Sequence, residues 1–69
     1  MLSMKITVNG QEKVFESSLS LENLIENLSQ NKDHVIAELN GNIIKSSKWL
    51  STAISDGDAI ELVTFVGGG

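Results

Sequence analysis

Apolar and polar residues alternate along two short stretches near the start of the chain. Residues Met4–Val8 carry an apolar side chain at every second position, a period typical of a strand with one buried face. Asn9-Gly10 follows, and both residue types tolerate the positive φ angles that a two-residue hairpin turn requires. Residues 12–16 resume a strand-like pattern. The first two strands are therefore predicted to form an antiparallel hairpin.

After this hairpin, the spacing of apolar residues changes to that of a helix. Leu21, Leu24, Ile25 and Leu28 follow the i, i+3, i+4, i+7 pattern, which places them in one stripe on an amphipathic helix. Ser20 precedes the stripe and is a favourable residue for capping a helix N-terminus. We expect this stripe to pack on one face of the sheet.

Three more strands and two turns are predicted in the second half of the chain. Residues 35–39 form a strand pattern that ends at the turn sequence of residues 40–42, and residues 43–44 suit a short edge strand. A second turn at residues 56–58 precedes a last strand at residues 59–66. The order β-β-α-β-β-β predicts an α+β fold, with a mixed sheet of four or five strands packed on one main helix.

Alternate residues of the last strand face opposite sides of the sheet. Ile60 and Leu62 suit the side that the helix covers. The other side carries apolar residues close to the end of the chain, and such exposed clusters often contact another molecule. The alternative is that they pack against Phe15 or Trp49 as neighbours on the same face. The residues predicted to form a partner interface are Glu61, Val63, Phe65 and Val66.

The sequence ends on three glycines, residues 67–69. A glycine run has no side chains to pack and does not hold one backbone conformation. We therefore predict one domain at residues 1–66, followed by a flexible tail at residues 67–69. The distinctive group of this tail is the α-carboxylate of Gly69, which a thin arm could carry into a narrow channel of an enzyme. The alternative is a frayed end, which is common at chain termini.

The chain contains no cysteine and only one histidine, His34. Disulfides, thiolate metal sites and a thiol nucleophile are therefore excluded. A lone histidine is typically a turn residue, and no pairing of acid and base and no metal-ligand spacing is present. We expect neither a bound metal nor an active site of its own.

Nine acidic residues against five lysines and no arginine give a net charge of −4. The absence of arginine argues against nucleic-acid binding. An acidic surface favours a basic partner, although it also keeps a small domain soluble. The chain has neither a leader pattern nor an apolar run of the about 18 residues that span a bilayer. We expect a cytoplasmic protein without a membrane partner.

Five motifs follow one another along the chain: Ile6–Gly10, Asn40–Ile44, Ser47–Trp49 with Thr52, Asp56–Val63, and Val66–Gly69. In this order they make the chain resemble the ThiS family, the sulfur carrier proteins of thiamine biosynthesis. The likeness covers nearly the whole chain from Met4 onward. One departure is Lys45-Ser46, where members often carry Pro-Arg, and this puts an arginine-mediated partner contact there in doubt.

The resemblance implies a ubiquitin-like β-grasp fold and a defined chemistry at the tail. An E1-like, ThiF-like adenylyltransferase would use ATP to adenylate the Gly69 carboxylate. A sulfur donor, such as a cysteine desulfurase or a sulfurtransferase, would then supply the sulfur of a thiocarboxylate. A ThiG-like thiazole synthase would take that sulfur, and Gly67 and Gly68 would give the tail its reach. No cofactor would be bound permanently.

Other functions remain open at this stage. The small subunit of molybdopterin synthase also ends in diglycine, although those chains are usually longer and approach the tail differently. A ubiquitin-like modifier would be ligated to lysines through Gly69, and a purely structural interaction domain would have no chemistry at its tail. An acyl carrier protein is disfavoured because such carriers are all-helical. The functions of the neighbouring genes in the genome would distinguish a thiamine sulfur carrier, a molybdopterin synthase subunit and a protein of neither pathway.

Overall fold

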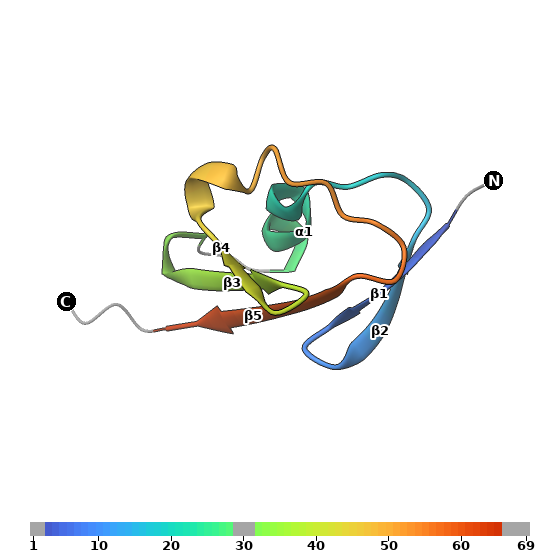
Figure 1. Cartoon of the computed structure of the whole chain (residues 1–69), viewed down its shortest axis with the longest axis horizontal. Helices are drawn as coiled ribbons and strands as arrows, with labels where there is room; N and C mark the ends of the chain where they lie inside the picture. Colours follow the sequence, from blue (N-terminus) through green and yellow to red (C-terminus); the bar gives the residue numbers. More distant parts are fainter. Residues whose placement is uncertain (1–2, 29–31, 66–69) are drawn as a thin grey trace.

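A mixed five-stranded sheet forms the centre of the molecule (Figure 1). The computed structural model describes residues 3–28 and 32–65. The strand order is β2-β1-β5-β3-β4, in which β1 pairs with β5 in parallel and the other pairings are antiparallel. This confirms the predicted mixed sheet. The strands are β1 (Met4–Val8), β2 (Gln11–Phe15), β3 (Val35–Leu39), β4 (Asn42–Ile44) and β5 (Ala59–Thr64).

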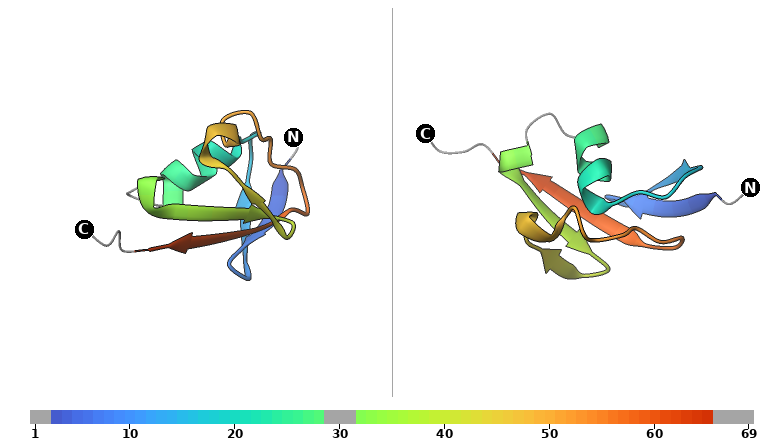
Figure 2. Two further views of the ribbon diagram at one scale, coloured as in Figure 1. Left: turned by 60° about the vertical axis from the view of Figure 1, so that its left-hand side comes forward. Right: turned by 90° about the horizontal axis from the view of Figure 1, so that it is seen from above.

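Helix α1 (Leu21–Leu28) lies across one face of the sheet, as Figures 1 and 2 show. Ser20 caps its N-terminus, as predicted: its Oγ accepts a hydrogen bond from the Asn23 amide at 3.1 Å. The Asn23 Oδ1 in turn accepts from the Ser20 amide at 3.4 Å, so the two residues form a reciprocal capping arrangement. Two short 3-10 helices, η1 (Lys32–His34) and η2 (Ser46–Lys48), lie in the connections.

The core fills the space between α1 and the sheet. Leu21, Leu24 and Ile25 are fully buried, which confirms most of the predicted helical stripe. Leu28 is 41% exposed, so its predicted burial is wrong. It is the last residue of α1 and borders an open hollow rather than the core. The other buried apolar residues are Ile6, Val8, Val35, Ala37, Trp49, Ile54 and Ile60.

The segment between β4 and β5 joins the start of α1 to the sheet. Trp49 is buried, and its Nε1 donates a hydrogen bond to the Ile44 carbonyl at 2.9 Å. The Trp49 carbonyl accepts from the Glu22 amide at 3.2 Å, and the Thr52 carbonyl accepts from the Leu21 amide at 2.8 Å. These contacts satisfy amide groups in the first turn of α1 that have no partner within the helix.

Strand β5 lies between β1 and β3, and an asparagine directly after each of these neighbours binds β5 or the turn before it through its side chain. Asn9 bonds both main-chain polar groups of Leu62, at 2.8 and 3.2 Å. On the other side, the Asn40 Oδ1 accepts from the Ala59 amide at 2.9 Å and its Nδ2 donates to an Asp58 carboxylate oxygen at 3.0 Å. Both asparagines have φ near 51°, so each Asn-Gly turn predicted from the sequence also fixes the position of β5.

Three strands differ from the prediction at one or both ends, and one of them, β4, begins at Asn42 rather than at residue 43. Strand β2 begins and ends one residue earlier than residues 12–16, and β5 ends at Thr64 rather than residue 66. Residues 66–69 lie outside the described part, so the predicted division into a domain at 1–66 and a tail at 67–69 stays a prediction. Among the described residues, no helix is long and apolar enough to cross a membrane.

Candidate partner-binding face

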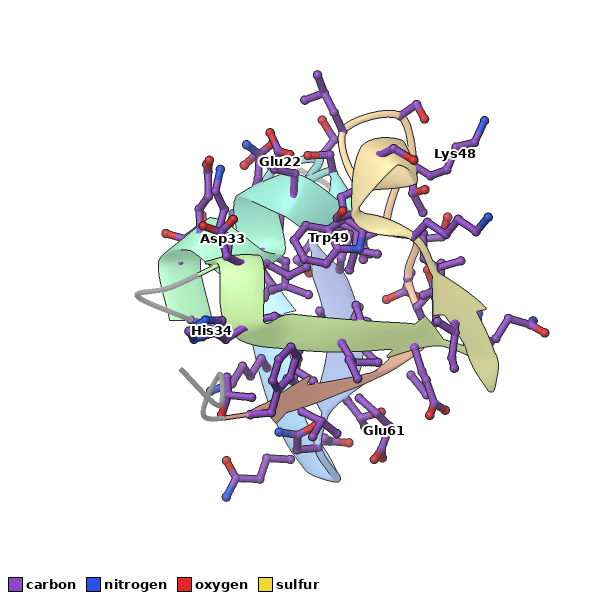
Figure 3. All side chains as sticks on the ribbon, turned by 90° about the vertical axis from the view of Figure 1, so that its left-hand side faces the viewer. Glu22, Asp33, His34, Lys48, Trp49 and Glu61 are labelled. Carbon is purple, nitrogen blue, oxygen red and sulfur yellow. The ribbon has the colours of Figure 1, made fainter. Side chains whose placement is uncertain are left out.

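The sheet face opposite α1 is open to solvent and carries apolar side chains near the end of β5. Ile60 faces the core, whereas Val63 and Phe65 are 53% and 46% exposed. Glu61 lies on the same open side, away from Trp49, as Figure 3 shows. The predicted division of β5 between two faces is therefore confirmed. We call this side of the sheet the outer face.

The alternative that aromatic residues cover Val63 and Phe65 is wrong. Trp49 belongs to the buried core on the helix side of the sheet, and Phe15 packs partly buried against that same core. Neither ring lies on the outer face, so these apolar side chains remain available to another molecule. Their role in binding a partner stays a prediction.

The strand register adds two residues that the sequence analysis did not identify. Ile36 lies directly opposite Val63 in the antiparallel β3–β5 pair and is 44% exposed. Ile43, which is 68% exposed, lies opposite Glu38 on the same face. Strand β3 contains apolar residues at neighbouring positions, so its sequence lacked the clean alternation that would have marked Ile36 as outward-facing. We call Ile36, Ile43, Val63 and Phe65 the outer apolar patch.

Phe65 is fixed in place by the residue that precedes β3. Its amide donates a hydrogen bond to the His34 carbonyl at 2.9 Å. The aromatic rings of His34 and Phe65 lie with their centroids 5.4 Å apart and their planes inclined by 39°. His34 lies in the short 3-10 helix η1, which agrees with the expected turn position, and its ring also contacts Phe65 at one side of the outer apolar patch. Phe65, at one end of the outer apolar patch, directly precedes residue 66 in the sequence.

The predicted tail residues cannot be placed on this surface. Val66, Gly67, Gly68 and Gly69 lie outside the described residues. Their predicted parts in partner binding, reach and adenylation stay predictions. The structure describes strand β5, which precedes these residues in the sequence (Figure 1).

Within residues 3–28 and 32–65, no group of three or more histidine or acidic side chains could hold a metal ion. One surface hollow of about 280 Å³ is lined by residues of β2, β1, β5 and the end of α1, among them Lys13 and Leu28. The pKa of Lys32 is raised because its ammonium donates a hydrogen bond to Glu26 at 2.9 Å and is attracted by that carboxylate. This pair is exposed on the surface.

The arrangement of five strands and one helix is that of a ubiquitin-like β-grasp protein. The fold is similar to the crystal structure of the thiamine biosynthesis protein ThiS from Geobacter metallireducens, with a TM-score of 0.82 and 35% identity. The match covers 96% of this chain and 100% of that chain. The model of the ThiS family matches residues 3–69. The chain belongs to the ThiS family.

Two curated relatives differ in how much of their length is matched. A thiazole synthase from Paramagnetospirillum magneticum is 38% identical over 66 residues, which cover 96% of this chain and 20% of that protein. The uncharacterized protein ycf40 from Porphyra purpurea is 33% identical over 67 residues, which cover 97% of this chain and 94% of that protein. The chain thus spans about a fifth of the thiazole synthase and nearly all of the Porphyra protein.

Proposed function

We propose that this protein carries sulfur for the synthesis of the thiazole ring of thiamine, on the α-carboxylate of Gly69. The observation that carries the proposal is the family match, which extends through the glycines at residues 67–69. The Geobacter structure, described as that of a thiamine biosynthesis protein, supports the same pathway.

The proposed chemistry begins with activation, because a carboxylate is a poor electrophile and its oxygen a poor leaving group. In an E1-like adenylyltransferase, a carboxylate oxygen of Gly69 attacks the α-phosphorus of ATP and pyrophosphate leaves. A thiol reductant releases sulfide from the persulfide of a sulfur donor, such as a cysteine desulfurase or a sulfurtransferase, and is itself oxidised to a disulfide; the sulfide then attacks the acyl carbon. The C–S bond forms, the C–O bond to AMP breaks, and a thiocarboxylate remains.

The sulfur must be carried on the main chain. The sequence contains no cysteine, so a persulfide on a side chain is impossible. A thiocarboxylate is a better nucleophile than a carboxylate and can transfer sulfur to an electrophilic carbon in thiazole synthase. The protein would then be a co-substrate of its partner enzymes, and ATP would be consumed by the adenylyltransferase rather than held here.

The outer face is the proposed docking surface for the adenylyltransferase and for thiazole synthase. Val63 and Phe65 would provide apolar anchors, with Glu61 on the same face and Val66 as the next residue in the sequence. Exposed apolar residues of this kind suit the central contacts of an interface. A further support is the Paramagnetospirillum relative: a protein named thiazole synthase contains the matching segment within its own chain.

Intact-mass analysis tests this function. The protein is incubated with ATP, its own adenylyltransferase and a sulfur source, and we expect a mass increase equal to replacing one oxygen atom by sulfur. Omission of ATP is the matched control and should abolish the increase. Conjugates between Gly69 and lysines of other proteins would instead support a ubiquitin-like modifier. Sulfur transfer to a molybdopterin precursor, but not to thiazole synthase, would support the molybdopterin alternative.

A further inference from the structure

Two glutamates occupy directly opposite strand positions on the outer face. Glu38 in β3 and Glu61 in β5 are directly opposite in the antiparallel register. Neither side chain has a hydrogen bond or an ion pair with another described residue. Like charges directly opposite on neighbouring strands destabilise a sheet. The register therefore places two like charges on neighbouring strands of the free protein.

The surroundings of this pair are apolar on two sides. Ile43 lies opposite Glu38 on the neighbouring strand β4. The next pair on the same face, two residues along each strand, is Ile36 with Val63. A partner that covers these exposed apolar side chains would also remove water from the two carboxylates. In such an environment an unneutralised pair of charges becomes more costly, and a matching cation is bound more strongly.

We propose that Glu38 and Glu61 form the seat for an arginine side chain of thiazole synthase, with Ile36, Ile43 and Val63 around it. This inference rests on the proposed function and names the chemistry by which the outer face recognises one partner. A guanidinium is planar, offers five N–H donors and can bond two carboxylates at once. It is also more weakly hydrated than an ammonium, so it suits a site with apolar walls better than lysine does.

The composition of the chain agrees with a cation supplied from outside. The protein has no arginine of its own. Among the described residues, the lysine that forms an ion pair is Lys32, and its partner is Glu26 rather than Glu38 or Glu61. An incoming arginine would convert the repulsion between Glu38 and Glu61 into two favourable contacts. The pair would thereby discriminate against partners whose docking surface lacks a cation at that position.

General attraction between an acidic protein and a basic partner is the competing explanation. Glu12 provides the matched control, because it is an exposed acid on the same outer face, in β2, and β1 separates it from β5. It too has no ion pair among the described residues. Glu12→Gln removes the same charge as Glu38→Gln or Glu61→Gln without touching the proposed seat.

Binding of thiazole synthase is measured by calorimetry for the wild-type protein, E12Q, E38Q, E61Q and the double variant E38Q/E61Q. We expect E12Q to change Kd by no more than about twofold, and the double variant to raise it by at least about tenfold. The thermal unfolding midpoints of E38Q and E61Q should stay the same or rise, since each substitution relieves repulsion. A double variant that binds like E12Q would overturn the seat.

Sulfur loading separates this inference from the proposed function. Each protein is also incubated with ATP, adenylyltransferase and a sulfur source, and its intact mass is determined. If the wild-type protein gains sulfur while E38Q/E61Q binds thiazole synthase like E12Q, the seat is wrong and the function stands. If the wild-type protein binds thiazole synthase through the two glutamates but gains no sulfur, the function fails and the seat stands. A wild-type protein that does not bind thiazole synthase overturns the seat.

Discussion

The side-chain amide of Asn9 pairs with both main-chain polar groups of Leu62. Its Oδ1 accepts from the Leu62 amide at 2.8 Å, and its Nδ2 donates to the Leu62 carbonyl at 3.2 Å. The main chain of Asn9 has already turned into the left-handed region, with φ at 51°. The side chain thus extends the contact between β1 and β5 beyond the point where β1 ends, on the strand that leads to the outer apolar patch.

Replacement of Asn9 should destabilise the protein in two separable ways. Asn9→Ala removes both hydrogen bonds and places an unfavourable residue at a positive φ angle, so we expect a loss of about 1–3 kcal/mol. Asn9→Gly removes the same bonds but tolerates the angle, and should therefore lose less. Urea unfolding measures both. Equal stability of the wild-type protein and the alanine variant would show that the Leu62 contacts contribute nothing.

Leu24 and Leu28 belong to the same predicted helical stripe but differ in burial. Leu24 is fully buried, so Leu24→Ala should cost about 2–5 kcal/mol of unfolding free energy. Leu28 is 41% exposed, and Leu28→Ala should cost less than about 1 kcal/mol because little buried surface is lost. Chemical denaturation of the two variants measures the difference. Comparable losses would contradict the packing of α1 described above.

The difference between these leucines shows what a local pattern can predict. The period of the sequence gives the existence of α1 and the bounds of β1 and β3, because alternation and helical spacing are properties of neighbouring residues. Whether the sheet extends beneath Leu28 depends on the positions of strands distant in the sequence. The exposed state of Leu28 therefore required the structure.

The residues of the candidate site also fall into two groups: those that a local pattern predicts and those that depend on tertiary structure. The outward direction of Val63 and Phe65 follows from alternation within one strand, and it was predicted correctly. The pairs Ile36–Val63 and Glu38–Glu61 depend on the register between β3 and β5, which single strands do not encode. The support of Phe65 by the His34 ring is also a tertiary contact. The irregular segment before β5 gave no periodic pattern from which the Trp49 bond to Ile44 could be foreseen.

Phe65 is the largest side chain of the outer apolar patch, and its truncation should weaken partner binding. We expect Phe65→Ala to reduce the affinity for the adenylyltransferase and thiazole synthase by more than about 1 kcal/mol, with the fold intact. Leu50→Ala is the matched control, because Leu50 is also exposed but follows η2, away from β5. Titration calorimetry with each enzyme gives the affinities. Unchanged affinity of the Phe65 variant for both enzymes would exclude this residue from the interface.

The tail is predicted to be mobile in the free protein and to become ordered on binding. Fixing each residue costs about 1–2 kcal/mol of backbone entropy, which main-chain hydrogen bonds in the partner must offset. Gly68→Val adds bulk and stiffness, so it should abolish activation of Gly69 while leaving the unfolding free energy unchanged. NMR order parameters for Gly68 as high as those of the central strands would contradict a mobile tail.

Shortening the tail should reveal where the sulfur is attached. Deletion of Gly69 leaves a terminal glycine, Gly68, one residue short, so some acquisition of sulfur should survive. Deletion of Gly68 and Gly69 together moves the carboxylate two residues back toward the domain, where it no longer reaches the activating site, and should abolish the mass gain. Intact-mass analysis after incubation with ATP, adenylyltransferase and a sulfur source gives the result. Because no cysteine is available to hold sulfur, a doubly shortened protein that still gains one sulfur would place the modification away from the chain end and disprove the proposed carrier chemistry.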